Sequence, residues 1–199
     1  MNNKEYRSVS FTFDEAEDKK LRGYAAVFNS FSEDLGGFKE VILPGAFRSS
    51  IESGKDILAL GHHNDQIILG RRSAGTLEIK EDDKGLYMEI DLPDTSEARD
   101  IREHVKLGNL KHMSFGFVVK EDDVYEEGGQ IIRALKDVEL FEVSVVAVPA
   151  YSSTEVAFRN LSERLSTTFG KNLIKYKRKL FDLQNQVSIE PEEEDNTNK

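Results

Sequence analysis

The stretch His112-Met113-Ser114-Phe115-Gly116-Phe117 decides how the rest of the chain is read. It follows a helical pattern and leads into a strand, in which successive side chains point to opposite faces. The three large apolar side chains therefore share one face, while Ser114 and Gly116 share the other. A hydroxyl on a surface cleared by a glycine suits a nucleophile that must be reached by a peptide carbonyl. A strand serine beside a packing glycine is the alternative, and the G-x-S-x-G elbow of another hydrolase class is absent.

The composition excludes several classes of protein. A chain of 199 residues fits one domain plus a tail, and the absence of cysteine excludes a disulfide framework, a thiolate nucleophile and cysteine-based zinc sites. A hydrolase of this composition must use a hydroxyl or a metal. The net charge of −10 argues against a nucleic-acid partner. No apolar run approaches the ~18 residues of a membrane span, and no signal peptide opens the chain, so we expect a cytoplasmic protein without a membrane partner.

Short strands dominate the predicted secondary structure, with one long helix and one short helix. This mixture predicts a mainly β fold with helices (α+β), a closed antiparallel β-barrel or sheet surrounded by a few α-helices. The expected strands are 6–13, 21–28, 38–43, 56–60, 75–79, 86–92, 114–120 and 131–148, the last as a strand pair or one bent strand. The expected helices run from Pro44-Gly45 to Gly54 and from a cap at Asp94 or Thr95 to Gly108, and polar loops are expected at 61–66 and 122–130.

The character of the sequence changes at about Arg159. Beyond it, leucines at helical spacing alternate with lysines, and the last ten residues, 190–199, are acidic and lack aromatic side chains. We therefore predict a domain at 1–159 and an appendage at 160–199, consisting of an amphipathic helix and a disordered acidic tail. The helix suits partner contact, and an ordinary solvated helix explains the pattern equally well.

Histidines near the middle of the chain are candidate bases. His62 and His63 lie in a polar loop between two apolar runs, where a base would reach the surface from a rigid support. His104 is expected to pack on the long helix, and His112 precedes Ser114 too closely to point at it. No ligand spacing such as His-Glu-x-x-His accompanies these residues, so neither a metal nor another cofactor is predicted.

A carboxylate stands inside the apolar run 140–146. Phe141, Val143 and Val145 are expected on one strand face, and Glu142 and Ser144 on the other. An unpaired buried carboxylate is costly, so Glu142 should have a partner. Ser144 is a rival nucleophile to Ser114, but its β-branched neighbours leave less room.

Two kinds of partner suit Glu142. An ion pair to Arg71, Arg72 or Arg133 would be structural. A hydrogen bond to a histidine would hold the imidazole in one tautomer and stabilise its charged form, as in a serine-protease triad.

Taken together, motifs spread over residues 20–159 resemble those of the tailed-bacteriophage prohead maturation proteases. The matching motifs are 23–29 (GYAAVFN), 40–47 (EVILPGAF), His63 followed by 69–71 (LGR), 75–77 (GTL), 92–95 (LPDT) with 98–100 (ARD), 113–117 (MSFGF), 140–146 (LFEVSVV) and 149–151 (PAY).

The resemblance implies a site and a fold. The family's catalytic serine falls on Ser114, its histidine on His63 and its acidic residue on Glu142. The related herpesvirus capsid-assembly proteases, whose closed barrel is ringed by helices, use a second histidine in the third place, so Glu142 is the position where this chain departs from them. Backbone N–H groups at 149–152 or at Gly70-Arg71 are candidates for holding the oxyanion.

The resemblance also implies an activity. Such an enzyme would be a serine endopeptidase that cleaves the major capsid protein or its scaffold segment, and itself, inside the immature capsid in the host cytoplasm. It could act as a homo-oligomer. A non-catalytic capsid scaffold protein and a small β-barrel binding module are the alternatives; the first has no need of Ser114 and His63, and the second leaves Glu142 unexplained.

Overall fold

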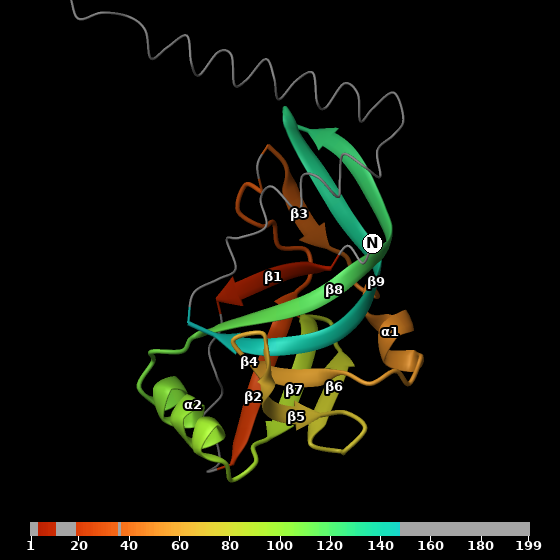
Figure 1. The fold of residues 1–199 in the computed structure, drawn as a ribbon. Helices are drawn as coiled ribbons and strands as arrows, with labels where there is room; N and C mark the ends of the chain where they lie inside the picture. The colour runs from red at the N-terminus through yellow and green to blue at the C-terminus, as the bar shows by residue number, and fades with distance from the viewer. Residues whose placement is uncertain (1–3, 11–18, 36, 148–199) are drawn as a thin grey trace, which may run out of the picture. The chain divides into compact units, whose positions relative to one another are not determined.

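The computed structural model describes residues 4–10, 19–35 and 37–147, all within the compact unit Met1–Ala157 (Figure 1). Residues 11–13 of the first predicted strand, the predicted turn at 149–152 and the appendage at 160–199 lie outside the described residues. The division of the chain at residue 159 therefore stays a prediction.

Among the described residues, nine strands form two sheets, and two helices accompany them. In the larger sheet the order is β1 (Glu5–Ser10), β8 (His112–Glu127), β9 (Gln130–Val146), β4 (Leu58–Gly61) and β5 (Asn64–Arg71), with β3 (Lys39–Ile42) also paired to β9. The smaller sheet has the order β2 (Lys20–Val27), β7 (Gly85–Asp91) and β6 (Leu77–Glu81). The helices are α1 (Arg48–Glu52) and α2 (Ser96–Lys106).

The prediction of a mainly β fold with helices is confirmed, but the closed antiparallel barrel is wrong. Among the described residues the larger sheet has β1 and β5 at its edges, and no ladder joins it to the smaller sheet. Two of its pairs are parallel, because β3 lies along the first part of β9 and β4 along the last part. A strand as long as β9 can carry two short neighbours in succession. Local alternation in the sequence does not indicate which partner a strand will take, or in which direction.

The two predicted polar loops are largely strand. Strand β8 runs on to Glu127 and turns into β9 through Gly128 and Gly129, both with positive φ (58° and 79°). This is the backbone that a two-residue hairpin turn requires. The predicted loop 61–66 likewise shrinks to two residues between β4 and β5. Polar side chains suggested loops because these hairpins are exposed to water.

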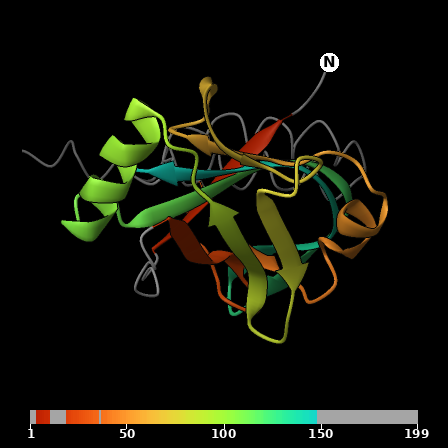
Figure 2. The same cartoon turned by 90° about the horizontal axis from the view of Figure 1, so that it is seen from below.

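The two sheets lie against each other (Figures 1 and 2), and apolar side chains from both form one buried core. Met113, Phe115 and Phe117 are fully buried in it, which confirms the apolar face expected for β8. From β9, Val143 and Val145 join the same cluster. Burial of this face fixes the register of β8 and β9, because a slip by one residue would turn every side chain to the other face. The register in turn decides what lies beside Ser114.

Helix α2 begins as the sequence predicts. The Thr95 hydroxyl accepts a hydrogen bond from the Ala98 N–H (3.2 Å), and Gly108 follows the helix end with φ of 72°. Ile101 packs so close to Gly61 that a Cβ there would lie 2.6 Å from it. Helix α2 therefore supports the turn between β4 and β5. No helix among the described residues is long and apolar enough to cross a membrane.

Replacing Thr95 by alanine should lower the free energy of unfolding by about 1 kcal/mol, because the first turn of α2 loses its cap. Urea denaturation followed by circular dichroism measures the change. The Thr95→Ser variant keeps the hydroxyl and should stay close to wild type. Equal stability of the alanine and serine variants would contradict the capping role.

Candidate active site

One face of the larger sheet gathers the candidate residues. In the antiparallel pairing of β8 and β9, Ser114 lies opposite Ser144, and Gly116 lies opposite Glu142. Residues directly opposite in such a pair project from the same face. Ser114, Glu142 and Ser144 therefore share the face of the sheet opposite the core, as their alternation with the apolar residues predicts.

A β-bulge at Phe141 shapes this face. The pairing passes from Gly116 opposite Glu142 directly to Phe117 opposite Leu140, so Phe141 has no residue opposite it. The prediction that Phe141 shares a face with Val143 and Val145 is therefore wrong: its ring lies beside Gly116 and is only partly buried. A bulge re-aims the side chains next to it, and bulges are common beside active sites.

Gly116 makes room for the carboxylate. A Cβ at this position would lie 2.6 Å from Glu142 Oε1 and 2.6 Å from the Phe141 ring. Real Cβ contacts are never this short, so the carboxylate can occupy its place because residue 116 has no side chain. The need for a glycine at position 116, two residues after Ser114, thus follows from the position of the Glu142 carboxylate.

His63 reaches the same face from a strained turn. His62 and His63 form the two-residue turn between β4 and β5, both with positive φ (56° and 58°). Positive φ is uncommon for residues other than glycine and costs of order 1 kcal/mol or more. Strand β9 holds the turn in place: the His62 N–H donates to the Val145 carbonyl (2.9 Å), and the His63 N–H donates to the Ser144 hydroxyl (3.3 Å).

A hydrogen-bonded network joins Glu142, His63 and Ser144. The distance from His63 Nδ1 to Glu142 Oε1 is 2.7 Å, and the Ser144 hydroxyl donates to Glu142 Oε2. Glu142 is 4% exposed, so its charge depends on these partners. With Nδ1–H donated to the carboxylate, the neutral imidazole keeps its lone pair on Nε2. That atom is buried and has no hydrogen-bond partner among the described residues.

Tyr6 of β1 covers this network. Its ring meets the His63 ring edge-on, with 4.6 Å between centroids, and packs in the same manner on Phe141. Burial, followed by the neighbouring Glu142 carboxylate, raises the pKa of the Tyr6 hydroxyl above its ordinary value. Tyr6 therefore stays neutral at physiological pH and adds no charge beside Glu142.

Ser114 lies next to the network without joining it. Its side chain is fully buried, and its hydroxyl donates to the backbone carbonyl of Arg7 on β1 (2.9 Å). The structure thus brings His63 and Glu142 together, whereas the Ser114 hydroxyl is engaged with the neighbouring strand.

The other candidates of the sequence analysis take different places. Glu142 pairs with a histidine rather than with an arginine. Arg71 pairs with Asp56, and Arg133 pairs with Glu5 and Asp122. His104 contacts Asn109 at the end of α2. The Gly70-Arg71 candidate for the oxyanion donors is partly engaged, because the Arg71 N–H already donates to the Thr76 hydroxyl (2.9 Å). The other candidate, 149–152, lies outside the described residues.

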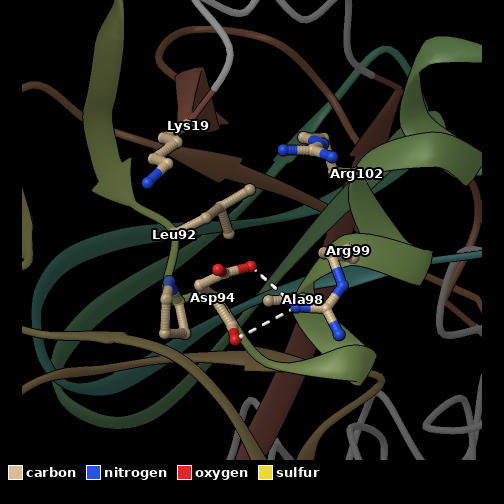
Figure 3. A pocket seen from close by; sticks show the side chains of 7 residues that line it. Lys19, Leu92, Asp94, Ala98, Arg99 and Arg102 are labelled. Carbon is tan, nitrogen blue, oxygen red and sulfur yellow. Dashed lines mark hydrogen bonds and ion pairs between the residues drawn. The ribbon is translucent and has the colours of Figure 1, made fainter.

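A small pocket lies elsewhere, between the end of β7 and the start of α2 (Figure 3). It is lined by Lys19, Leu92, Pro93, Asp94, Ala98, Arg99 and Arg102. Arg99 is already paired with Asp94 at 2.7 Å, as the dashed lines show, and no candidate catalytic residue takes part. Within the described residues no three His, Asp or Glu side chains gather as metal ligands. The prediction of a metal-free enzyme stays a prediction.

Sequence reasoning missed three features of the site. Tyr6 gave no signal, since nothing in a strand pattern shows that its ring will meet His63. The sequence suggests Ser144 only as a rival nucleophile. In the structure its hydroxyl contacts both Glu142 and the backbone of His63. The bulge at Phe141 interrupts the alternation of buried and exposed side chains, and a sequence pattern that assumes strict alternation cannot reveal it.

The geometry fixes which imidazole tautomer should be present. In the neutral imidazole, ¹⁵N nuclear magnetic resonance should show a protonated Nδ1 and an unprotonated Nε2, because Nδ1–H donates to Glu142. In Glu142→Gln the tautomer should move toward protonated Nε2, since the carboxylate acceptor is gone. Unchanged imidazole shifts in this variant would contradict the hydrogen bond.

Comparison with known proteins identifies the family. Residues 1–168 match the model of the caudovirus prohead serine protease family. The chain is 31% identical over 160 residues to the prohead protease of Enterobacteria phage HK97, which covers 74% of this chain and 67% of that protein. It is 32% identical over 135 residues to the prohead protease of Escherichia phage T5, covering 65% and 58% of the two chains.

In fold, the chain resembles the solved capsid assembly protease of bacteriophage T4, with a TM-score of 0.50, 7% identity, and coverage of 72% of this chain and 96% of that chain. This likeness concerns the fold alone. The family model and the HK97 relative show that the chain belongs to the caudovirus prohead serine protease family.

Proposed function

We propose that this chain is a prohead maturation endopeptidase in which Ser114 is the nucleophile, His63 the general base and Glu142 the residue that orients His63. Membership of a serine protease family gives the reaction class. The observation that carries the assignment is the 2.7 Å contact between His63 Nδ1 and the buried carboxylate of Glu142. It leaves Nε2 as a basic nitrogen on the face that holds Ser114.

The mechanism follows from this arrangement. Nε2 of His63 takes the proton of the Ser114 hydroxyl as Oγ attacks the carbonyl carbon of a peptide bond. Glu142 stabilises the imidazolium that forms, and the network through Ser144 holds the carboxylate in place. The imidazolium then gives its proton to the leaving amine, and the C–N bond breaks. Water, deprotonated by the same nitrogen, releases the acyl group from Ser114 and restores the enzyme.

The proposed substrates follow from the relatives. Those of HK97 and T5 are named prohead proteases, and that of T4 a capsid assembly protease. For this chain we propose the major capsid protein or its scaffold segment, together with the chain itself, as substrates inside the immature capsid in the host. A non-catalytic scaffold protein would have no use for a strained turn that presents a histidine to a buried carboxylate. Self-association, and partner contact by the helix predicted within residues 160–199, stay predictions.

Cleavage of the capsid protein from the same phage, followed by intact mass over time, tests the assignment. Ser114→Ala and His63→Ala should each lose at least ~10³-fold in rate, and Glu142→Gln should lose less, as in other triads. Defined fragments from wild type, with none from the two alanine variants, support the mechanism. Equal cleavage by wild type and both alanine variants would show that another protease is responsible. A Glu142→Gln variant that cleaves at the wild-type rate would show that Glu142 takes no part in the mechanism.

Ser144 offers a matched test, because its hydroxyl touches Glu142 and the His63 backbone. Ser144→Ala should cleave roughly tenfold more slowly, the order of effect seen when a residue that supports a catalytic group is removed. Ser144→Thr keeps the hydroxyl and should recover most of the rate. A complete loss in Ser144→Ala, with Ser114→Ala active, would show that Ser144 is the nucleophile.

A further inference from the structure

Phe141 is an extra residue in the pairing of β8 and β9. The ladder passes from Gly116 opposite Glu142 to Phe117 opposite Leu140, so it would be regular at this point without Phe141. The side chain of Phe141 is only partly buried and lies outside the core cluster of the described residues. A bulge disrupts the ladder and re-aims a side chain. What Phe141 contributes therefore lies on the face of the sheet opposite the core.

The bulge brings the Phe141 ring next to the carboxylate of Glu142. The point where a Cβ of residue 116 would stand is 2.6 Å from Phe141 Cε2, 2.9 Å from Phe141 Cζ and 2.6 Å from Glu142 Oε1. The edge of the ring and this oxygen are therefore neighbours above Gly116. Oε1 is also the oxygen that lies 2.7 Å from His63 Nδ1. The ring thus borders the hydrogen bond between Glu142 and His63.

Two further side chains hold the ring in this place. The Tyr6 ring meets it edge-on, with 6.2 Å between centroids and an interplanar angle of 87°, and the same Tyr6 ring contacts His63 at 4.6 Å. The ammonium group of Lys4 lies over the Phe141 ring, 4.5 Å from its centroid, where a cation is attracted to the ring. Because Phe141 and His63 share Tyr6 as a neighbour, the orientations of the two rings are linked.

A ring in this position favours the hydrogen bond in two ways. It fills space beside Oε1 that water would otherwise occupy, and both the hydrogen bond and the attraction between carboxylate and imidazolium are stronger where water is excluded. The edge of an aromatic ring also carries partial positive charge, which suits a carboxylate oxygen. Glu142 is 4% exposed, and removing the ring would open Oε1 to water.

We propose that Phe141 is a positioning residue of the active site: the bulge sets its ring against Glu142, where it keeps water away from the hydrogen bond between Glu142 and His63. This inference rests on the proposed function, since it relies on the roles given there to His63 and Glu142. The ring acts through the carboxylate and takes no part in bond breaking itself.

Proton exchange at His63 tests the proposal without any cleavage. In ¹⁵N-histidine-labelled protein at one fixed pH, the Nδ1–H proton should exchange with water at least about tenfold faster in Phe141→Ala than in wild type, because water then reaches Glu142 Oε1. Phe141→Leu keeps apolar bulk beside the carboxylate and should exchange nearly as slowly as wild type. Equal exchange in wild type and the alanine variant would overturn the proposal.

Tyr125 supplies the matched control. It is an aromatic residue of the same strand pair, 41% exposed, and lies about 30 Å from Gly116 along β8 at ~3.3 Å per residue. Tyr125→Ala should change neither the exchange at His63 nor the rate of cleavage. Circular dichroism shows whether each variant is folded. If Phe141→Ala does not fold, Phe141→Val takes its place and should exchange faster than Phe141→Leu.

Cleavage rates test whether the ring acts through Glu142. Phe141→Ala should lower kcat roughly tenfold and leave KM close to wild type, because weaker support for His63 affects the chemical step. In a Glu142→Gln background the same replacement should cost less than about twofold, since the carboxylate that the ring shields is gone. A change confined to KM would make Phe141 a substrate contact, and a full tenfold loss in the Glu142→Gln background would show that the ring acts on another group. Either result overturns the proposal.

The two measurements separate this proposal from the proposed function. If wild type does not cleave the capsid protein, the proposed function fails, and proton exchange alone judges the role of the ring. If wild type cleaves while exchange is the same in wild type and Phe141→Ala, the proposed function stands and the role of Phe141 fails.

Discussion

A carboxylate buried in a β-sheet is the constraint on which the site depends. Glu142 is 4% exposed, and a charge so placed must be met by hydrogen bonds. His63 and Ser144 supply them, Gly116 leaves the space, and the bulge at Phe141 adjusts the strand beside it. The positive φ of the histidine turn is held by other hydrogen bonds, from the His62 N–H to the Val145 carbonyl and from the His63 N–H to the Ser144 hydroxyl. Strain of this kind persists where the surroundings enforce it, which is characteristic of functional sites.

Strand β9 connects this site to the rest of the fold. It carries Glu142 and Ser144, and it pairs with β8 so that Ser144 lies opposite Ser114. It also pairs with β4, which ends at the histidine turn. The apolar face of the same two strands fills the core. Packing of the core therefore sets the register that places the polar groups on the other face. Strand β1 pairs with β8 at the edge of the sheet, and its Arg7 carbonyl accepts the hydrogen bond of the Ser114 hydroxyl.

The sequence predicts short-range features well and partners poorly. The alternation around Ser114, the cap at Thr95 and the buried carboxylate at 142 follow from local patterns, because burial and capping act over a few residues. The open pair of sheets and the parallel pairing of β3 and β4 do not, since strand partners are chosen across the chain. The short turn at His62-His63 was hidden by its polar neighbours. The family resemblance selected His63 over His62, which residue chemistry alone left open.

The proposal that Ser114 is the activated nucleophile can be tested by covalent labelling. A fluorophosphonate, which forms a covalent bond to activated serine hydroxyls, should be added to protein that is visibly cleaving its capsid substrate, and the adduct mapped by mass spectrometry. We expect a single adduct on Ser114 that stops cleavage and is absent in His63→Ala. An adduct on another serine of protein that has lost its activity, with Ser114 unmodified, would contradict it.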